Sequence, residues 1–376
     1  MKIFFCNFLL FLFFFNAGFS QNKTTYLLVG TYTDSKPGKG IYVYAMNAAT
    51  GELTLKSTGE NITNPSFLNI SPNGKFLYAC TETKTLVPGN VSAFAIDSVN
   101  GSISFINKQS STGANPVYVM VDKSNQFLAV ANYTAGSAVV LSINKNGSVN
   151  AAVQSIQFYD SSINKTRQEK SHIHSTIFSP DYDYLYLPDL GSDKIRAFKF
   201  DRANASPLIA ADNLTVKAIP GSGPRHMVFH PNKKFGYCIE EMSGMVVVYS
   251  YNKGKLVPSQ RINSNQKKVD EYSSADIHIS PDGLFLYASN RVENTVSIFS
   301  IGSNGLLKLI GHEPTQGDVP RNFTIDPTGN FLLVANQGTN NIIVFRRNKK
   351  TGMLTNTGFQ VSVPAPSCLQ IRSYNL

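Results

Sequence analysis

Residues 70–80 read ISPNGKFLYAC, and the same pattern returns as ISPDGLFLYAS at residues 279–289 and as IDPTGNFLLVA at residues 325–335. Each copy has an apolar residue before a Ser-Pro or Asp-Pro turn and an apolar run after it. Proline presets the backbone of a turn, and Asn-Gly or Asp-Gly closes it. Because Phe, Leu, Tyr and Val favour strands, the pattern predicts a repeated β-hairpin.

Three more copies of this hairpin are divergent. They are FSPDYDYLYLP (residues 178–188), FHPNKKFGYCI (229–239) and VDKSNQFLAVA (121–131), where Lys123 replaces the proline. The turn positions are residues 72, 123, 180, 231, 281 and 327, which lie 46 to 57 residues apart. Apolar runs such as 294–301 and 340–347 supply a third strand, and Asn-Gly or Thr-Gly turns introduce a fourth. Four antiparallel strands per repeat make one blade of a β-propeller.

The two ends of the chain supply a seventh blade. SCLQIR (residues 367–372) is an innermost strand without its hairpin partner, and YLLVGT (26–31) is the missing second strand. Pairing the two closes the ring and leaves no sheet edge free to aggregate. An open β-solenoid is the alternative, but it does not explain half a blade at each terminus. We predict an all-β, seven-bladed propeller with four antiparallel strands per blade.

The first 20 residues predict a secretory signal peptide. Lys2 precedes an apolar run over residues 3–15, and Ala17 and Ser20 with their small neighbour Gly18 suit cleavage near Ser20. An uncleaved membrane anchor is the alternative, but the run is short for a spanning helix. We expect a mature domain of residues 21–376 that is exported to the periplasm or secreted, monomeric and without a membrane span.

Composition narrows the possible partners and cofactors. The formal net charge is +10, but Lys and Arg form no long run, so small anions are favoured over nucleic acid. Glycine-rich nucleotide-binding motifs are absent from the sequence. Cys80, Cys238 and Cys368 lie in predicted strands of different blades, and their small apolar neighbours indicate buried thiols. No Cys-x-x-Cys pair suggests zinc, and we expect neither a metal nor a cofactor.

Two positions of the repeat vary strongly. The position six before the turn proline begins the innermost strand and holds Ser66, Val117, His174, Arg225, Ala275, Arg321 and, in the split blade, Ser367. The position ten after it ends the second strand and holds Glu82, Tyr133, Leu190, Glu241, Arg291, Gln337 and Tyr32. Because the positions are symmetric about the turn, we expect them to be cross-strand neighbours, with Arg225 facing Glu241. One mouth of the central channel should therefore gather His174, Arg225, Glu241, Arg291, Arg321 and Glu82.

The residue types of this cluster indicate chemistry on an anion. Arginine binds carboxylate or phosphate through two parallel hydrogen bonds and stabilises oxyanions. His174 titrates near neutral pH and could move a proton, and Glu241 could act as a base or hold Arg225 in place. A single histidine with few free carboxylates argues against a metal site. We expect His172 to lie in a loop, and His226 and His278 to pack between blades because their strand parity is opposite.

Three segments also resemble a known family. GSGPRHMVFHPN (221–232), ADIHISPDGLFLYASNR (275–291) and VPRNFTIDPTGNFLLVANQ (319–337) are similar to the lactonase family of seven-bladed propellers, which includes 6-phosphogluconolactonases and muconate lactonizing enzymes. The resemblance spans essentially the whole mature chain. It implies metal-independent hydrolysis of a sugar-acid lactone or another anionic lactone. The alternatives are cyclisation of an unsaturated dicarboxylate, or an exported propeller that binds an anionic ligand without catalysis.

The resemblance implies a catalytic set of one His, two Arg and one Glu. By motif these are His174, Arg225, Glu241 (with Glu240 adjoining) and Arg291, with Arg321 as a neighbour or rival. Arg321, Glu82, Tyr133 and Gln337 would bind the substrate. The family's phosphogluconolactonase role is cytoplasmic, so the predicted export leaves the substrate itself open.

Overall fold

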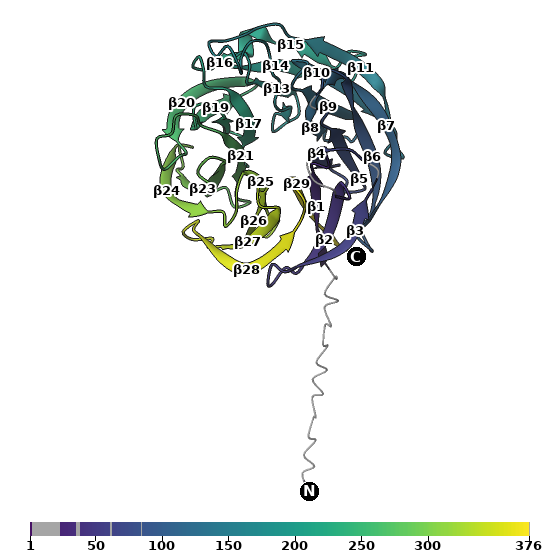
Figure 1. Ribbon diagram of the computed structural model, residues 1–376, viewed down its shortest axis with the longest axis vertical. Helices are drawn as coiled ribbons and strands as arrows, with labels where there is room; N and C mark the ends of the chain where they lie inside the picture. Colours follow the sequence, from purple (N-terminus) through teal and green to yellow (C-terminus); the bar gives the residue numbers. More distant parts are fainter. Residues whose placement is uncertain (2–22, 35–37, 61, 84, 376) are drawn as a thin grey trace.

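The computed structural model describes residue 1 and residues 23–34, 38–60, 62–83 and 85–375. The predicted signal peptide, apart from Met1, lies outside the described residues. Over the described residues the chain forms seven sheets arranged in a ring (Figure 1). The predicted all-β propeller of seven four-stranded blades is confirmed, although the third blade carries one additional short strand.

The first three blades follow one another along the chain. Blade 1 comprises β4 (Pro65–Ile70), β5 (Phe76–Thr81), β6 (Pro88–Asp97) and β7 (Ser102–Ala114). Blade 2 comprises β8 (Pro116–Val121), β9 (Phe127–Asn132), β10 (Ser137–Ile143) and β11 (Val149–Gln157). Blade 3 comprises β12 (Ile177–Phe178), β13 (Tyr184–Asp189), β14 (Lys194–Phe200), β15 (Leu208–Ala210) and the additional β16 (Val216–Lys217), with a 3-10 helix at Asp212–Leu214.

The next three blades are more regular. Blade 4 comprises β17 (Pro224–Phe229), β18 (Phe235–Glu240), β19 (Met245–Asn252) and β20 (Lys255–Asn263). Blade 5 comprises β21 (Ser274–Ile279), β22 (Phe285–Asn290), β23 (Thr295–Ile301) and β24 (Leu307–Pro314). Blade 6 comprises β25 (Pro320–Ile325), β26 (Phe331–Asn336), β27 (Asn341–Arg347) and β28 (Leu354–Ser362).

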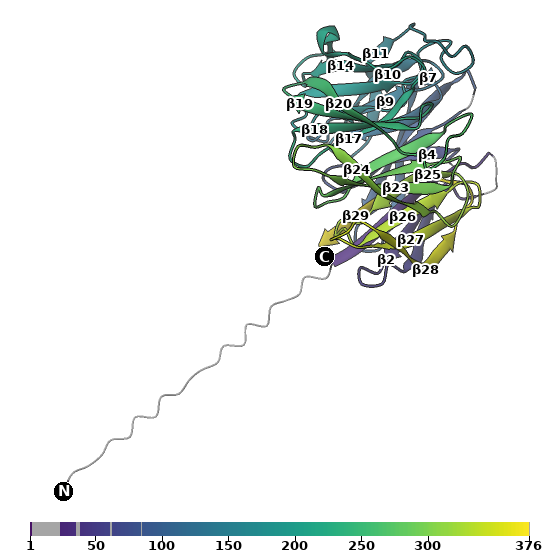
Figure 2. The same ribbon diagram turned by 90° about the vertical axis from the view of Figure 1, so that its left-hand side faces the viewer.

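The seventh blade joins the two ends of the chain, as predicted. It comprises β29 (Pro366–Asn375), β1 (Lys23–Thr31), β2 (Ile41–Met46) and β3 (Leu53–Gly59). β29 runs antiparallel to β1, with Lys23 opposite Asn375 and Leu27 opposite Ile371. The side view shows the end of β29 beside the start of β1 (Figure 2). The ring is thus closed by main-chain hydrogen bonds rather than by a covalent link.

The residue before the turn proline explains the repeated Ser-Pro and Asp-Pro pairs. Ser280 Oγ accepts a hydrogen bond from the Phe285 amide at 3.1 Å, and Asp326 Oδ1 accepts one from the Phe331 amide at 2.6 Å. These side chains therefore satisfy the amide that starts the second strand. The turn is specified locally, by residues that are near neighbours in sequence.

The hydrophobic core lies between the blades. Each apolar cluster joins neighbouring sheets, such as Val246 and Phe299 from blades 4 and 5. Buried tyrosines of the second strands connect adjacent blades, since the Tyr237 hydroxyl donates to the Gly305 carbonyl at 2.9 Å. Gly305 has φ +80°, and an added Cβ would lie 2.4 Å from the Phe235 ring. Glycine is therefore required at this turn of blade 5, where the main chain packs against the Phe235 ring of blade 4.

The three cysteines of the predicted mature chain are buried and free, as expected. Burial raises the pKa of the Cys80 thiol to about 12, so it is a protonated packing residue at neutral pH. Across the described residues, no helix has the length and apolar character that crossing a bilayer requires.

The start of each innermost strand departs from the simple hairpin register. Pro224 pairs with Glu240 and His226 with Ile239, so Arg225 is the extra residue of a β-bulge. The same shift leaves Ser66, Val117 and Arg321 unpaired in β4, β8 and β25. The expectation that the two variable positions pair directly across the hairpin is therefore wrong. A bulge re-aims the side chain, and here it directs these residues toward the mouth of the channel.

A second hydrogen bond fixes the other variable position. In all seven blades the amide of the residue at the end of the second strand donates to a carbonyl two residues before the bulge. Examples are Glu82 to Asn64 at 3.1 Å and Glu241 to Gly223 at 2.8 Å. The two sets of side chains therefore meet at one end of the ring, although they are not ladder partners.

Candidate active site

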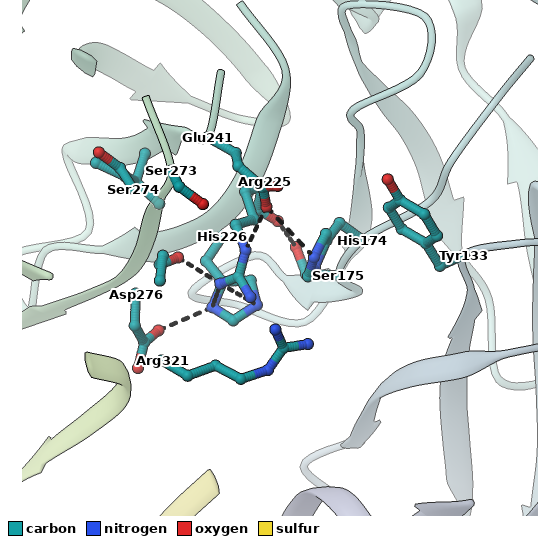
Figure 3. Close-up of polar contacts among 12 residues, drawn as sticks. Tyr133, His174, Ser175, Arg225, His226, Glu241, Ser273, Ser274, Asp276 and Arg321 are labelled. Atoms are coloured by element: carbon teal, nitrogen blue, oxygen red, sulfur yellow. Dashed lines mark hydrogen bonds and ion pairs between the residues drawn. The ribbon is translucent and has the colours of Figure 1, made fainter. Parts of the chain in front are cut away.

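Glu241 lies at the centre of the cluster at the channel mouth. Its Oε2 accepts a hydrogen bond from Arg225 Nε at 2.9 Å and lies 3.1 Å from Arg291 Nη2. His174 Nε2 is 3.8 Å from the same oxygen. Figure 3 shows Arg225, Glu241 and His174 converging, with the Arg321 side chain reaching toward them. The structure thus brings together the charged residues and the histidine of the two variable positions, including the predicted Arg225–Glu241 contact.

The adjoining Glu240 points elsewhere. It forms an ion pair with Arg261 Nη2 at 2.7 Å and accepts a hydrogen bond from the Ser243 hydroxyl at 2.6 Å. Successive residues of a strand point to opposite faces, so only one of the two glutamates can reach the channel mouth. Glu241 is that residue, which resolves the ambiguity between them.

The charge of Glu241 is held by its arginine neighbours. Burial alone would raise the pKa of this carboxyl, but Arg291 and Arg225, with smaller contributions from His174 and Arg167, hold it well below its usual range. A carboxylate that is stabilised in this way is a weak proton acceptor. Glu241 is therefore suited to orienting the arginines rather than to acting as the base.

His174 is buried, and its Nδ1 has no hydrogen-bond partner within the described chain. Burial, and then the nearby charge of Arg225, lowers the pKa of His174 well below 6.5, so the imidazole is neutral at pH 7. His174 precedes β12 instead of beginning a strand, and its amide donates to the Pro188 carbonyl at 2.9 Å. The Tyr133 ring meets the imidazole edge-on at 5.4 Å between centroids and stacks on His172, which lies in a loop as expected.

Arg225 is 2% exposed, yet it has a partner on each side. Besides Glu241, its Nη1 donates to the Ala275 carbonyl and lies 3.2 Å from His226 Nε2. The same Nη1 is 3.4 Å from His226 Nδ1, so the guanidinium lies against the imidazole and not along one lone pair. His226 Nδ1 is 2.8 Å from Asp276 Oδ1, which accepts its proton as a hydrogen bond. Asp276 thus holds the imidazole of His226 against the guanidinium of Arg225.

His226 lies in the channel, so the expectation that it packs between blades is wrong. Its ring contacts Tyr118 and Phe67 across the ring, with centroids 5.3 and 6.0 Å away. Phe67 and Tyr118 stack on each other at 4.0 Å. The bulge explains this position, because the extra residue lets two consecutive side chains, Arg225 and His226, face the axis.

These aromatic side chains close the channel below the cluster around Glu241. A cavity of about 10 Å³ on one side is lined by residues that include His174, Arg225, Arg321 and Glu82. A larger one, about 290 Å³, lies on the other side and is lined by Asp276 and His278 among others. His278 therefore also faces the channel, although its ring packs on Phe323 of the next blade as well. The first cavity suits roughly one water molecule.

Arg321 and Glu82 form the other half of the mouth. Arg321 Nη2 lies 3.9 Å from Glu82 Oε2, which accepts a hydrogen bond from the Tyr32 hydroxyl at 2.6 Å. The Arg321 guanidinium also lies 5.3 Å from the centroid of the Tyr32 ring. Gln337 is only half-buried. Its main-chain amide donates a hydrogen bond to the Val319 carbonyl at 3.0 Å. Within the described residues, Gln337 therefore stands apart from the hydrogen-bonded cluster.

Arg167 also reaches this site, and the repeat gave no indication of it. It lies in the segment 158–172 between β11 and β12, and its Nη2 contacts Glu241 Oε1 at 2.6 Å. The signal in the sequence was the longest step between turn positions, from 123 to 180. Among the described residues, no group of three His, Cys, Asp or Glu side chains is placed to hold a metal ion.

Comparisons with known proteins agree on one family. Residues 26–371 match the sequence model described as "Lactonase, 7-bladed beta-propeller". The chain is 49% identical over 354 residues to a 6-phosphogluconolactonase of Formosa agariphila, covering 93% of this chain and 100% of the relative. It is 32% identical to a 6-phosphogluconolactonase of Bacillus subtilis, covering 91% and 97%. The periplasmic gluconolactonase of Pseudomonas aeruginosa has a TM-score of 0.88 at 32% identity, with coverage of 93% and 99%.

Proposed function

The chain belongs to the lactonase family of seven-bladed β-propellers and is a lactone hydrolase, and we propose that it opens a sugar-acid lactone that carries an anionic group. The arginines that converge around His174 and Glu241 carry this proposal. The catalytic residues are His174, Arg225, Glu241 and Arg291, and the substrate contacts are Arg321, Glu82 and Tyr133.

His174 is the base that activates water. It is neutral at pH 7 and lines the small cavity, its Nδ1 has no hydrogen-bond partner among the described residues, and its Nε2 faces the carboxylate of Glu241. The water oxygen bonds to the lactone carbonyl carbon as its proton passes to the imidazole. Glu241 then stabilises the imidazolium that forms, as an acidic partner does in other His-dependent hydrolases. When the ring C–O bond breaks, the same proton passes to the leaving oxygen and yields the hydroxy acid.

The arginines stabilise the negative charge that develops on the carbonyl oxygen. Arg225 is buried and fixed by Glu241, Ala275 and His226, so it needs little reorganisation during the reaction. Arg321 lines the same small cavity as Arg225. Removal of one such donor costs about 100- to 1,000-fold in kcat in comparable sites.

A panel of lactones tests this function on residues 21–376. We expect the wild-type protein to hydrolyse 6-phosphogluconolactone or gluconolactone, and His174→Ala and Arg225→Ala to lose at least about 100-fold in kcat. Circular dichroism and Tm would show that the variants remain folded. Full activity in both variants would sink the site assignment. Turnover of muconates alone would favour cyclisation, and tight binding without turnover would favour a binding protein.

The similarity to a periplasmic gluconolactonase supports the proposal that this enzyme is exported. Export would separate it from the cytoplasmic pool of phosphorylated sugars, which makes the unphosphorylated lactone an equal candidate. The intact mass of the protein that is recovered from the producing cell would show whether the chain is cut near Ser20.

A further inference from the structure

The segment 158–172 presents Arg167 at the channel mouth in a fixed position. Gln168, next in sequence, is fully buried, and its Nε2 donates to the Leu190 carbonyl at 2.9 Å and to Asp193 Oδ2 at 2.8 Å. On the other side, Asn164 Oδ1 accepts a hydrogen bond from the Arg167 amide at 3.0 Å. The backbone on both sides of Arg167 is therefore anchored. Its side chain is presented by a rigid loop and not by the repeated strands.

Arg167 differs from the other arginines of the site in its exposure. Its side chain is 43% exposed, against 2% for Arg225, 14% for Arg291 and 19% for Arg321. Both hydrogen bonds of its side chain within the described chain use Nη2, at 2.6 Å to Glu241 Oε1 and 3.3 Å to the Tyr133 hydroxyl. Its Nη1 and Nε donors therefore stay available to an incoming acceptor.

The charge balance of the mouth favours a negatively charged acceptor. Four guanidinium groups face the carboxylates of Glu241 and Glu82, with a third carboxylate, that of Glu169, on the rim beside His172, and His174 is neutral. Part of the surplus positive charge lies at the exposed rim of the mouth, because Arg167 has the most exposed side chain of the four arginines. A small substrate whose carbonyl lies against His174 would direct its far end toward this rim.

We propose that Arg167 is a specificity-determining residue, which binds a phosphate or carboxylate on the substrate at the end remote from the lactone carbonyl. The proposal rests on the lactonase function given above, because it assigns a second contact to the same substrate. The free Nη1 and Nε groups can each give a charge-assisted hydrogen bond to an oxygen of either group. Arg167 would therefore select charged lactones over neutral ones, while the buried residues perform the hydrolysis.

Kinetics on matched substrates test the proposal. The probes are glucono-1,5-lactone, its 6-phosphate, and a glucaric acid lactone with a free carboxylate, assayed with Arg167→Gln and Arg167→Lys. We expect Arg167→Gln to lower the ratio of kcat/KM for charged over neutral lactone by about 10- to 100-fold, mainly through KM. Arg167→Lys keeps the charge but loses the planar set of donors, so its ratio should fall less. Comparing the two charged lactones shows whether phosphate or carboxylate is the preferred group.

Arg261→Gln is the matched control. Arg261 is 31% exposed and forms an ion pair with Glu240, one residue from Glu241 but on the other face of the strand. Its removal should leave the ratio within about twofold of the wild-type value. If Arg167→Gln lowers turnover of charged and neutral lactones equally, or changes neither, the assignment of Arg167 is wrong.

A binding measurement separates this inference from the proposed function. Calorimetric titration with 6-phosphogluconate and with gluconate needs no turnover. If the wild-type protein hydrolyses no lactone but binds the phosphorylated acid at least about 10-fold more tightly than Arg167→Gln does, the function fails and the role of Arg167 stands. If both proteins bind the two acids alike, the role of Arg167 is overturned, whatever the activity.

Discussion

Glu241 shows how one carboxylate can organise a site without titrating. Arg225, Arg291 and Arg167 all contact it, and His174 lies 3.8 Å away. Each arginine is held by a further partner, as Arg291 is by the Ser273 carbonyl at 3.0 Å. The residue with chemical freedom is therefore His174, because its imidazole is neutral and its Nδ1 has no hydrogen-bond partner among the described residues.

The buried histidines predict a loss of stability in acid. His226 has its pKa lowered to about 4 by burial and by Arg225, and the pKa of His174 is also well below 6.5. Between about pH 6.5 and 4 the unfolded chain binds protons that the folded chain does not, so the free energy of unfolding falls as pH falls. The loss is at most about 1.4 kcal/mol per pH unit for each histidine. Urea unfolding followed across this range should show the slope.

A variant isolates the contribution of His226. Arg225, Asp276, His278 and His174 are the charged or titratable groups that surround it. We expect His226→Gln to be less stable at pH 7 but to lose less stability between pH 6.5 and 4. Unfolding between pH 7 and 9, where neither histidine changes charge, serves as the reference. Identical acid slopes in the two proteins would contradict this explanation.

At the scale of the strand, a residue in the left-handed conformation directly precedes most innermost strands, two positions before the bulge. It is Asn64, Asn115, Gly223, Val319 or Ala365, with φ between +41° and +67°. Its carbonyl accepts the hydrogen bond that fixes the residue at the end of the second strand. Asparagine and glycine tolerate this conformation, but a β-branched valine does not. Val319, at φ +58°, is therefore a strained position in the fold.

Replacing Val319 with asparagine should relieve this strain. Asn64, at the equivalent position, donates a hydrogen bond from Nδ2 to the Glu82 carbonyl at 2.9 Å. An asparagine at position 319 would offer the same hydrogen bond to the Gln337 carbonyl. We expect Val319→Asn to gain about 1 kcal/mol of stability, seen as a rise in Tm of roughly 2 °C by calorimetry. Val319→Ala removes only the branching and should gain less. A Tm equal to or below the wild-type value would show that the strain is compensated elsewhere.

At the scale of the molecule, the ring depends on β29 for closure. β29 is innermost in blade 7, and it pairs with β1 from Lys23 to Thr31. Buried residues on it, including Cys368 and Leu369, belong to the apolar clusters that join blade 7 to its neighbours. Closure thus covers the edge of β1 and completes two blade interfaces at once, which makes the last strand as important as any in the middle of the chain.

Removing residues 366–376 should therefore open the ring. The edge of β1 and the faces of blades 6 and 1 would be exposed, so we expect aggregation and loss of a single cooperative thermal transition. Removing residues 375–376 alone takes away only the outermost ladder pair and is the control. Light scattering and calorimetry compare the two truncations. A monodisperse protein with the wild-type Tm after the longer deletion would show that closure is dispensable.

The sequence by itself determined the blade, the number of blades, the closing pair of strands and the two positions that meet at the mouth. These follow from turn residues and strand periodicity, which act over a few residues and repeat with each blade. Only the tertiary structure decided which of those side chains touch, since the bulge at Arg225 changes the register and turns His226 into the channel. It also placed Arg167 on Glu241, because a loop outside the repeat reaches a contact 74 residues away in sequence. Such contacts depend on the packing of the whole ring, and no local pattern in the chain encodes them.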